Sequence, residues 1–359
     1  MVRSSTRGKI ASKSLVHLRG FWPVVVLIAL ALVASACGAS ANEKSAGASA
    51  TSGQAAGGEA GSASPAQTRT QNLTVRIGYQ KYGTLNILKA DGSLDKKLAE
   101  QGIKVEWTEF PGGPQLLEAL NVGSIDIGHT GEAPPVFAQA AGAPLVYLAH
   151  EPASPKAEGI LVPKDSPIQS VADLKGKKVA LNKGSNVHYL LVKLLEQAGV
   201  DYKDIETVYL PPADGRAAFE SGNVDAWVIW DPFLAAAQTA TGGRLLADGT
   251  DLVSNFEYYL ASRSFAEKYP DVIDTLLEEA DKIDAWGRAN QKELAELLSP
   301  QLGIDVPSLE LASGRRQYGV LPIDQSVIDA QQQIADTFRD LKLIPTTIDI
   351  NDAVLPAKK

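Results

Sequence analysis

LEALNVGSIDI spans residues 117–127, and AAFESGNVDA at residues 217–226 repeats its plan about a hundred positions later. Each stretch reads as a helix end, a glycine, a polar residue, a β-branched residue and an aspartate. Each is then followed by a strand that leads into a new helix start, at residues 129–135 and 230–233. A pattern this short can recur by chance. As a true repeat, it predicts two related α/β lobes.

The sequence around the repeat alternates strands with helices. Apolar or alternating runs typical of strands occupy residues 73–77, 105–110, 125–127 and 178–181, and Pro114 opens a helix that ends at Gly123. After the fourth strand, a helix with leucines on one face continues to Gly199, which stops it. Strands that alternate with helices predict a mainly parallel sheet in each lobe.

Helices dominate the C-terminal third. Ser264 and Glu267 are spaced as a capping box, and a long apolar-periodic run covers residues 324–341. We expect these helices to return to the first lobe. The first lobe is therefore predicted to comprise residues 73–162 and 253–348, and the second lobe residues 163–252.

Composition excludes several classes of protein. The chain has 359 residues, of which 45% are hydrophobic and 21% charged, so it must bury a core, and its length predicts two domains plus accessory segments. Removing the five basic residues of the acid-free segment 1–36 from the 34 Lys and Arg leaves 29 against 42 Asp and Glu. The resulting net charge of −13 argues against a nucleic-acid partner. A small anion can still bind, because backbone N–H groups and helix dipoles provide local positive potential.

Residues 1–36 have the pattern of a signal peptide. A basic stretch precedes an apolar run at 24–34, which is too short to span a bilayer, and small residues then precede Cys37, the single cysteine. This arrangement resembles a bacterial lipobox with Cys37 as the lipidated residue, although Ala34 departs from the usual leucine or valine. Ordinary secretion is the alternative. Residues 37–72 read as a lipidated cysteine and a flexible tether, which predicts an exported protein anchored to the outer face of the cell membrane, or a periplasmic one.

Two helix starts form the candidate ligand site. Thr130, Gly131 and Glu132 precede two prolines in the first lobe, and residues 184–186 hold the equivalent place in the second. Free N–H groups and the helix dipole at such starts favour an anion. The same residue types are also ordinary helix caps that bind nothing, and Asp231 likewise reads first as a cap. Similarly, Trp227 and Trp230 suit a core, and Tyr79, Gln80 and Tyr82 either face a crevice or only pack.

Motifs for catalysis are absent from the sequence beyond residue 36. It contains no GxSxG elbow, Walker loop, GxGxxG turn or HExxH helix. His129, His150 and His188 lack the spacing of a metal pair and are interpreted as polar surface or hinge residues. We therefore expect no enzyme activity, no metal and no cofactor.

Four longer segments carry a family resemblance: IGYQKYGTL from Ile77, EFPGGPQLLEALNVGSIDIGHTGEAPPVFAQAAG from Glu109, VADLKGKKVALNKGSNVHYLL from Val171 and GNVDAWVIWDPF from Gly222. They resemble the aliphatic sulfonate-binding proteins of ABC importers, periplasmic-type lipoproteins of the sulfonate, nitrate and taurine family. The resemblance covers about residues 73–348. It implies a type II periplasmic-binding-protein fold, in which two α/β lobes close on a sulfonate in the cleft between them. It also implies a monomer that delivers its ligand to a permease and an ATPase for sulfur acquisition.

The resemblance also implies site residues. On the sulfonate side these are Thr130, Gly131, Gly184, Ser185 and Asn186, with Gln80, Trp230 and Asp231 nearby. Glu132 stands where relatives often have a shorter residue, and it would either select a ligand with a cationic tail or complement the helix dipole. Taurine, nitrate or another small anion is the alternative ligand. A biosynthetic enzyme of the same fold and a structural surface lipoprotein are the alternative classes, and export argues against the enzyme.

Overall fold

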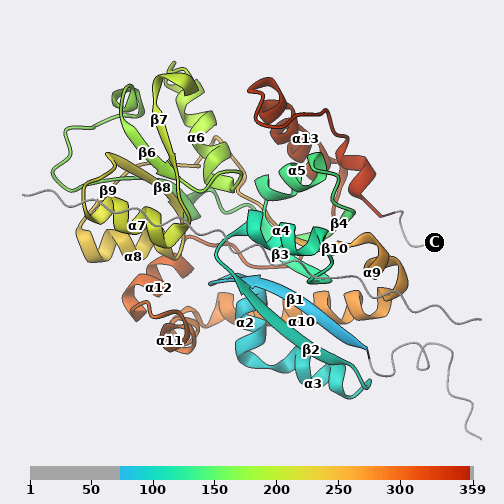
Figure 1. Ribbon diagram of the computed structural model, residues 1–359. Coiled ribbons are helices and arrows are strands. Elements are labelled where there is room, and N and C mark those ends of the chain that lie inside the picture. Colours follow the sequence, from blue (N-terminus) through green and yellow to red (C-terminus); the bar gives the residue numbers. More distant parts are fainter. Residues whose placement is uncertain (1–72, 356–359) are drawn as a thin grey trace, which may run out of the picture. The chain divides into compact units, whose positions relative to one another are not determined.

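Two five-stranded sheets with flanking helices make up the computed structural model, which describes residues 73–355 (Figure 1). The first sheet has the order β2(Lys104–Phe110), β1(Thr74–Gln80), β3(Ile127–Gly131), β10(Glu257–Ser262), β4(Leu145–His150). The second has the order β7(Glu206–Tyr209), β6(Lys178–Leu181), β8(Ala226–Trp230), β5(Glu158–Val162), β9(Arg244–Asp248). The predicted signal peptide, Cys37 and the tether lie outside the described residues.

The two sheets have equivalent topologies. In the first, β1 pairs in parallel with β2 and β3, and β10 is antiparallel to β3 and β4. In the second, β6 pairs in parallel with β7 and β8, and β5 is antiparallel to β8 and β9. In each sheet four strands run in the same direction, as predicted for a mainly parallel sheet, and one strand, β10 or β5, enters from the other lobe and runs the opposite way. The shared strand order supports two related lobes.

The two aspartates of the sequence repeat occupy equivalent places. Asp126 accepts a hydrogen bond from the backbone N–H of Arg76 at 2.9 Å, and Asp225 accepts one from Lys178 at 2.8 Å. The N–H of each aspartate also donates back to the carbonyl of the same partner at 2.8 Å. In each lobe, the aspartate therefore ties β1 or β6 to the segment that leads directly into the central strand β3 or β8.

One boundary of the predicted lobes differs from the structure. β5 was placed in the first lobe, but it pairs with β8 and β9 in the second sheet. Its apolar sequence suits either sheet, and only the long-range pairing decides. The chain crosses between the sheets at residues 151–157 and again at 249–256. The remaining lobe boundaries stay a prediction.

Helices cover both faces of each sheet (Figure 1). Those that follow first-lobe strands are α2(Thr84–Asp91), α3(Ser93–Ala99), α4(Gly113–Asn121), α5(Ala133–Ala140), α9(Arg263–Lys268), α10(Pro270–Ala289), α11(Gln291–Leu302), α12(Val306–Ser313) and α13(Gln325–Asp340). Those of the second lobe are α6(Asn186–Gln197), α7(Pro212–Glu220) and α8(Phe233–Thr241). Single helical turns occupy Pro155–Ala157, Val171–Leu174, Tyr202–Asp204 and Ile350–Ala353. Within residues 73–355, no helix combines the length and apolar character needed to cross a membrane.

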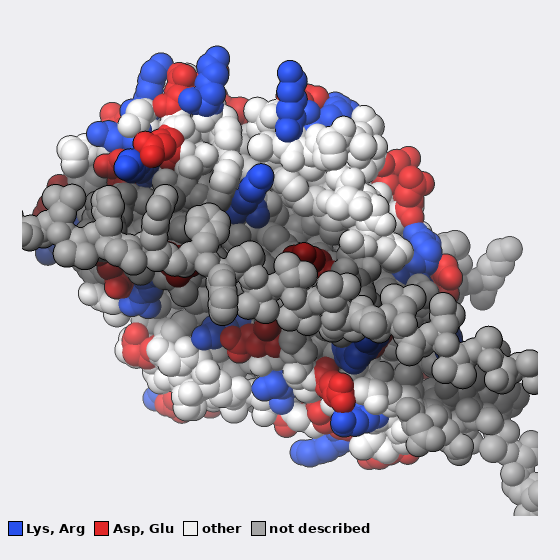
Figure 2. Space-filling view, in the orientation of Figure 1, with Lys and Arg blue, Asp and Glu red and all other residues white. Residues whose placement is uncertain are grey.

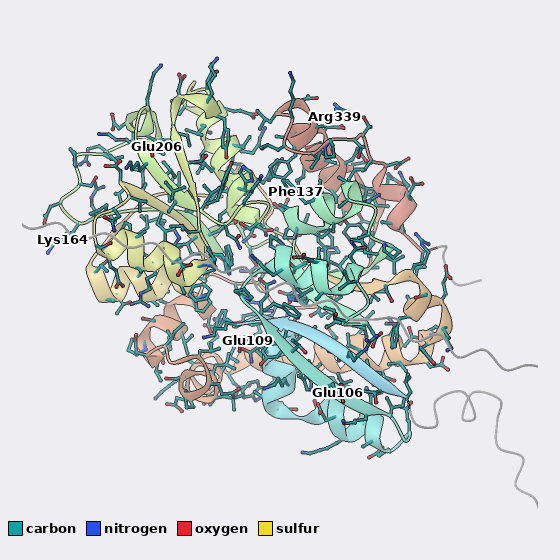
Figure 3. The ribbon with its side chains drawn as sticks, in the orientation of Figure 1. Glu106, Glu109, Phe137, Lys164, Glu206 and Arg339 are labelled. Carbon is teal, nitrogen blue, oxygen red and sulfur yellow. The ribbon has the colours of Figure 1, made fainter. Side chains whose placement is uncertain are left out.

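Of the C-terminal helices, α10 packs on α2 and α3 and α13 packs on α5, all in the first lobe, whereas α12 also packs on α8 of the second lobe. One apolar core lies under α2, α3, α10 and α11, and another lies in the second lobe around Trp227. A third core continues from the first sheet to the second through α5, α6 and α13. Phe137 of α5, labelled in Figure 3, stacks on His188 of α6 with 6.3 Å between ring centroids. The third core therefore joins the two lobes, whereas each of the other two fills the interior of a lobe.

Three local predictions need correction. The strand expected at 125–127 begins only at Ile127, because Asp126 is engaged at the start of β1. The cap of α9 is Ser262, whose hydroxyl accepts from the N–H of Phe265, so the expected box at Ser264 does not start that helix. His129, His150 and His188, interpreted as surface or hinge residues, are all buried, so none is a surface residue. Each packs against aromatic rings, which remove it from solvent. His150 ends β4 and adjoins the crossing segment 151–157.

Charged side chains of both signs share the surface. On the face shown in Figure 2, Lys and Arg alternate with Asp and Glu around the described periphery. Exposed pairs such as Arg216 with Glu220 and Lys282 with Glu278 link neighbouring helical turns. Exposed pairs of this kind contribute little to stability, about 0–1 kcal/mol each. The net negative charge is therefore dispersed on this face.

Candidate ligand-binding site

Two adjoining pockets lie between the two sheets. We call the first the donor pocket; its lining is Gln80, Gly113, Thr130, Gly131, Pro134, Ser185, Asn186, Trp230, Asn255 and Glu257. We call the second the charged pocket; its lining is Gln80, Lys81, Tyr82, Gly83, His129, Glu151, Ser154, Ala157, Trp230, Asp231, Asn255, Glu257 and Arg316. They share Gln80, Trp230, Asn255 and Glu257, so they are parts of one cleft.

The carboxyl ends of three parallel strands position the donor pocket. Gln80, Gly131 and Trp230 are the last residues of β1, β3 and β8. The pocket is also bordered by the starts of α4, at Gly113, and of α6, at Asn186. Side chains and helix starts meet at this edge because each βα unit reverses the chain there. Six of the nine predicted site residues line this pocket: Gln80, Thr130, Gly131, Ser185, Asn186 and Trp230.

Thr130 provides an unpaired donor in the pocket. Its side chain is 1% exposed, and its hydroxyl has no hydrogen-bond partner among the described residues. A Cβ on Gly113 would come within 1.9 Å of this hydroxyl, so glycine is needed for the start of α4 to lie against Thr130. A buried hydroxyl without a partner costs free energy unless a ligand engages it.

Asn186 connects the two lobes across the pocket. Its amide oxygen accepts from the N–H of Ala133 at 3.2 Å, and its amide nitrogen donates to Asn255 at 2.5 Å. Asn255 in turn donates to the carbonyl of Ser154 at 2.9 Å. A Cβ on Gly131 would meet the Asn186 side chain at 2.1 Å, so glycine allows α6 to approach β3. The lobes are in contact here.

Ser185 and Gly184 hold the turn before α6. Ser185 is the N-cap residue, but its hydroxyl donates to the carbonyl of Asn182 at 2.7 Å and does not cap the helix. Gly184 has φ +75°, where glycine is favoured, and its N–H donates to Nδ1 of His188 at 3.1 Å. The structure therefore places Ser185 in the pocket lining and Gly184 behind it, with its N–H already engaged.

Glu132 is a predicted site residue that lines neither the donor pocket nor the charged pocket. It is 1% exposed, lies at the N-cap of α5, and accepts from the N–H of Phe256 at 2.9 Å. Burial raises its pKa to about 7, although hydrogen bonds from Phe256 and Asn255 act in the opposite direction. It lines neither pocket, so its position favours the helix-end role over selection of a cationic ligand tail.

Asp231 and Trp230 border the charged pocket from the second lobe. Asp231 accepts from the N–H of Ala235 in the first turn of α8, in keeping with its reading as a cap, and pairs with Arg315 at 3.4 Å. Burial raises the pKa of Asp231 to about 6, against the lowering effect of Arg315. Trp230 is half-buried and lines both pockets, whereas Trp227 is buried in the core as expected.

Sequence reasoning missed the buried charges of the first lobe. Glu151 lies 2.8 Å from His129 and 2.7 Å from Arg316, and it accepts from the hydroxyl of Thr84 at 2.6 Å. Burial alone would raise the pKa of Glu151, but Arg316 and His129 lower it to about 2. Glu257 adds a carboxylate 3.7 Å from Nδ1 of His129. No local pattern marks these residues, because their partners lie far away in sequence.

Two α/β lobes with a polar pocket at the carboxyl ends of their strands define a two-lobed solute-binding protein. The family model described as NMT1/THI5 like matches residues 98–282. A relative from Escherichia coli (strain K12), named as an aliphatic sulfonates-binding protein, is 48% identical, covering 78% of this chain and 88% of its own length. The chain belongs to the NMT1/THI5-like family, together with this relative.

Solved structures agree with this assignment. The alkanesulfonate-binding protein SsuA from Xanthomonas axonopodis pv. citri, bound to MOPS, superposes with a TM-score of 0.76 at 40% identity, covering 80% of this chain and all of its own. The periplasmic aliphatic sulphonate binding protein SsuA from Escherichia coli gives 0.72 at 46% identity, covering 80% and 94%. The predicted fold is thus confirmed. The desulfurization enzyme DSZB shares the fold at 17% identity with a TM-score of 0.59, so the fold also serves catalysis.

Proposed function

We propose that this chain is the extracytoplasmic substrate-binding protein of an ABC importer, and that it captures aliphatic sulfonates for sulfur acquisition. It hands them to a membrane permease driven by an ATPase and catalyses no reaction itself. The observation that carries the proposal is the donor pocket, in which the unpaired hydroxyl of Thr130 lies beside the starts of α4 and α6. The 48% identity to an aliphatic sulfonates-binding protein supports the ligand class.

The chemistry of the pocket suits a sulfonate. A sulfonate is a fully ionised anion whose oxygens accept hydrogen bonds and donate none, so its site needs donors. Thr130 supplies an unpaired hydroxyl, Gln80 and Asn186 supply amide groups, and the two helix starts supply N–H groups with their dipoles. None of the described residues that line this pocket is Lys or Arg. Hydrogen bonding and helix dipoles, more than ion pairing, would hold the anion.

Closure of the lobes is expected because the hydrogen-bond donors of the pocket belong to both lobes. Gln80 and Thr130 belong to the first lobe, and Asn186 at the start of α6 belongs to the second. An anion that needs all of them is bound fully only when the lobes meet, so it stabilises the closed form by its differential affinity. This is the form that the permease would receive.

Anchoring at the membrane completes the proposal. The apolar run, the small residues before the single cysteine and the polar segment after it support Cys37 as the lipidated N-terminus of the mature protein. Cys37→Ser should release the protein into the medium, and labelled fatty acid should be incorporated by the wild type only. A variant that stays in the membrane, with no label in the wild type, would refute the anchor.

Titration calorimetry tests the ligand. Wild-type protein should bind butanesulfonate more tightly than taurine, nitrate or sulfate. Ser185 lines the donor pocket, so Ser185→Asp puts a carboxylate beside the anion, and sulfonate affinity should fall more than a hundredfold. Thermal unfolding checks that the variant is folded, because it also loses the hydroxyl that donates to Asn182. Ser185→Asn is the neutral control of similar size. Stronger binding of nitrate or taurine would change the ligand class, and unchanged binding by Ser185→Asp would move the anion elsewhere.

A further inference from the structure

A third hollow opens from the same cleft and differs from the other two in its chemistry. We call it the proline groove, and its apolar walls are Phe110, Pro111, Pro211, Pro212, Trp230 and Phe233. Gln80, Lys81, Glu109 and Ala213 complete the lining. Lys81 and Glu109 carry opposite charges, so the groove presents mainly apolar surface without a net charge of its own.

Equivalent loops of the two lobes form opposite walls of the groove. Phe110 and Pro111 follow Glu109 at the end of β2, where Figure 3 labels Glu109, and Pro211 and Pro212 follow the end of β7. β2 and β7 are the corresponding edge strands of the two sheets. Pro211 is exposed, and the groove is therefore open toward solvent between the lobes.

The groove is continuous with the donor pocket. Gln80 and Trp230 line the donor pocket, the charged pocket and the groove. Trp230 also contacts Phe233 edge to face, with 6.3 Å between the ring centroids. A Cβ on Gly112 would lie 2.6 Å from the amide of Asn182 and 3.7 Å from the Trp230 ring, so glycine lets the first-lobe loop close over this junction.

We propose that the proline groove holds the apolar tail of the ligand, so that the protein prefers long-chain alkanesulfonates over short or polar ones. This inference rests on the proposed function, because it takes the sulfonate group to occupy the donor pocket. An alkyl tail passing Trp230 would enter a groove with aromatic and prolyl walls on both sides. Burial of each methylene group there strengthens binding, and an open outer end sets no sharp limit on chain length.

A chain-length series tests the inference with the full-length protein. Titration calorimetry with methanesulfonate, butanesulfonate and octanesulfonate should show affinity rising about fourfold for each methylene that the groove buries. Phe233→Ala removes an aromatic wall. Ala213→Asp places a carboxylate at the exposed start of α7, where a negative charge suits the helix, and thus charges the groove without opposing the fold.

Both variants should bind methanesulfonate as the wild type does and should lose about tenfold or more in affinity for octanesulfonate. Ala217→Asp is the matched control, since Ala217 is exposed on the same helix outside the groove lining, and it should bind the whole series like the wild type. Equal affinity of the wild type for all three sulfonates, or an unchanged series in Ala213→Asp and Phe233→Ala, would overturn the tail site alone. Failure of every sulfonate to bind would instead overturn the proposed function.

Discussion

Thr130 is a residue whose contribution to stability and contribution to binding should have opposite signs. Its hydroxyl is buried without a partner among the described residues, which costs about 1–3 kcal/mol in the ligand-free protein. Thr130→Val keeps the shape and removes the hydroxyl. We expect an unchanged or higher melting temperature, together with a roughly ten- to hundredfold weaker binding of butanesulfonate, the loss typical of a hydrogen bond to a charged group.

Calorimetry and thermal unfolding on the same sample check both halves of this prediction. Thr130→Ser is the control, because it restores the hydroxyl and should recover most of the affinity. If Thr130→Val bound as tightly as the wild type, the anion would not be held by this hydroxyl. A large fall in melting temperature would mean that the hydroxyl has a structural partner.

The shifted pKa values of two buried glutamates predict how the stability of the protein depends on pH. The pKa of Glu151 is about 2, below its ordinary value of 4.5, so its contribution is present above about pH 4.5 and is lost as the pH falls toward 2. The pKa of Glu132 is raised to about 7, so its contribution is present below about pH 4.5 and is lost as the pH rises through 7. Stability should therefore be greatest at mildly acidic pH.

Glu132→Gln isolates the alkaline part of this profile. Glutamine can still accept from the N–H of Phe256 but does not ionise. At pH 8 the variant should be more stable than the wild type by on the order of 3 kcal/mol, and at pH 4.5 the two should be similar. Chemical denaturation at both pH values measures this. An equal difference at the two pH values would show that Glu132 does not titrate as proposed.

At the scale of elements, the repeated aspartates fix equivalent strands with unequal strength. Both accept from a backbone N–H of β1 or β6, but Asp126 also pairs with the guanidinium of Arg76 at 2.6 Å. Asp225→Ala should cost about 1 kcal/mol of unfolding free energy, and Asp126→Ala should cost more, because it also removes a half-exposed ion pair. Urea denaturation should show that both variants are less stable than the wild type. Titration with butanesulfonate should show that both still bind it. A larger loss for Asp225→Ala would contradict this ranking.

The elements that sequence predicts well are those set by local residues. The strand at Lys178–Leu181 and the helix that follows it were predicted because apolar period and turn residues are local signals. The strand β5 was not predicted, and the lobe boundary expected after residue 162 places it with the first lobe, since its partners β8 and β9 lie more than sixty residues away.

The same limit applies to the site. Local sequence signals indicate Thr130 and Gly131, which precede a pair of prolines, and Asn186, which begins a helix. Glu151 and Arg316, by contrast, meet across 165 residues, and Asn255 reaches Ser154 across 101. Periodicity carries no information on such pairings, so the charged pocket appears only once both lobes are assembled.

At the scale of the whole molecule, the lobes are connected in two ways, by side-chain contacts across the cleft and by the two crossing segments of the chain. Arg315, which follows α12, reaches Asp231 at 3.4 Å and Gln238 at 2.7 Å in the second lobe, and Asn186 contacts Ala133 and Asn255. The crossing segments 151–157 and 249–256 each run from the edge strand of one sheet to the neighbour of the edge strand in the other, from β4 to β5 and from β9 to β10. β2 and β7 lie at the opposite edges, so a hinge at the crossings would separate these two strands most.

Distance measurement between β2 and β7 should therefore report closure. Glu106 and Glu206 are exposed, lie on these strands and are labelled in Figure 3, and Cys37 is the single native cysteine to replace. In a Cys37→Ser background, spin labels at Glu106→Cys and Glu206→Cys should give longer distances without ligand and shorter ones with saturating butanesulfonate, because the anion needs donors from both lobes. Arg315→Ala should shift the ligand-free protein further toward long distances, since it removes a tie between the lobes. A second pair at Glu106→Cys and Lys104→Cys, within β2, should not change. If the β2–β7 distance were the same with and without a ligand that calorimetry shows to be bound, the lobes would not close on it, and the donor pocket would have to be a preformed site.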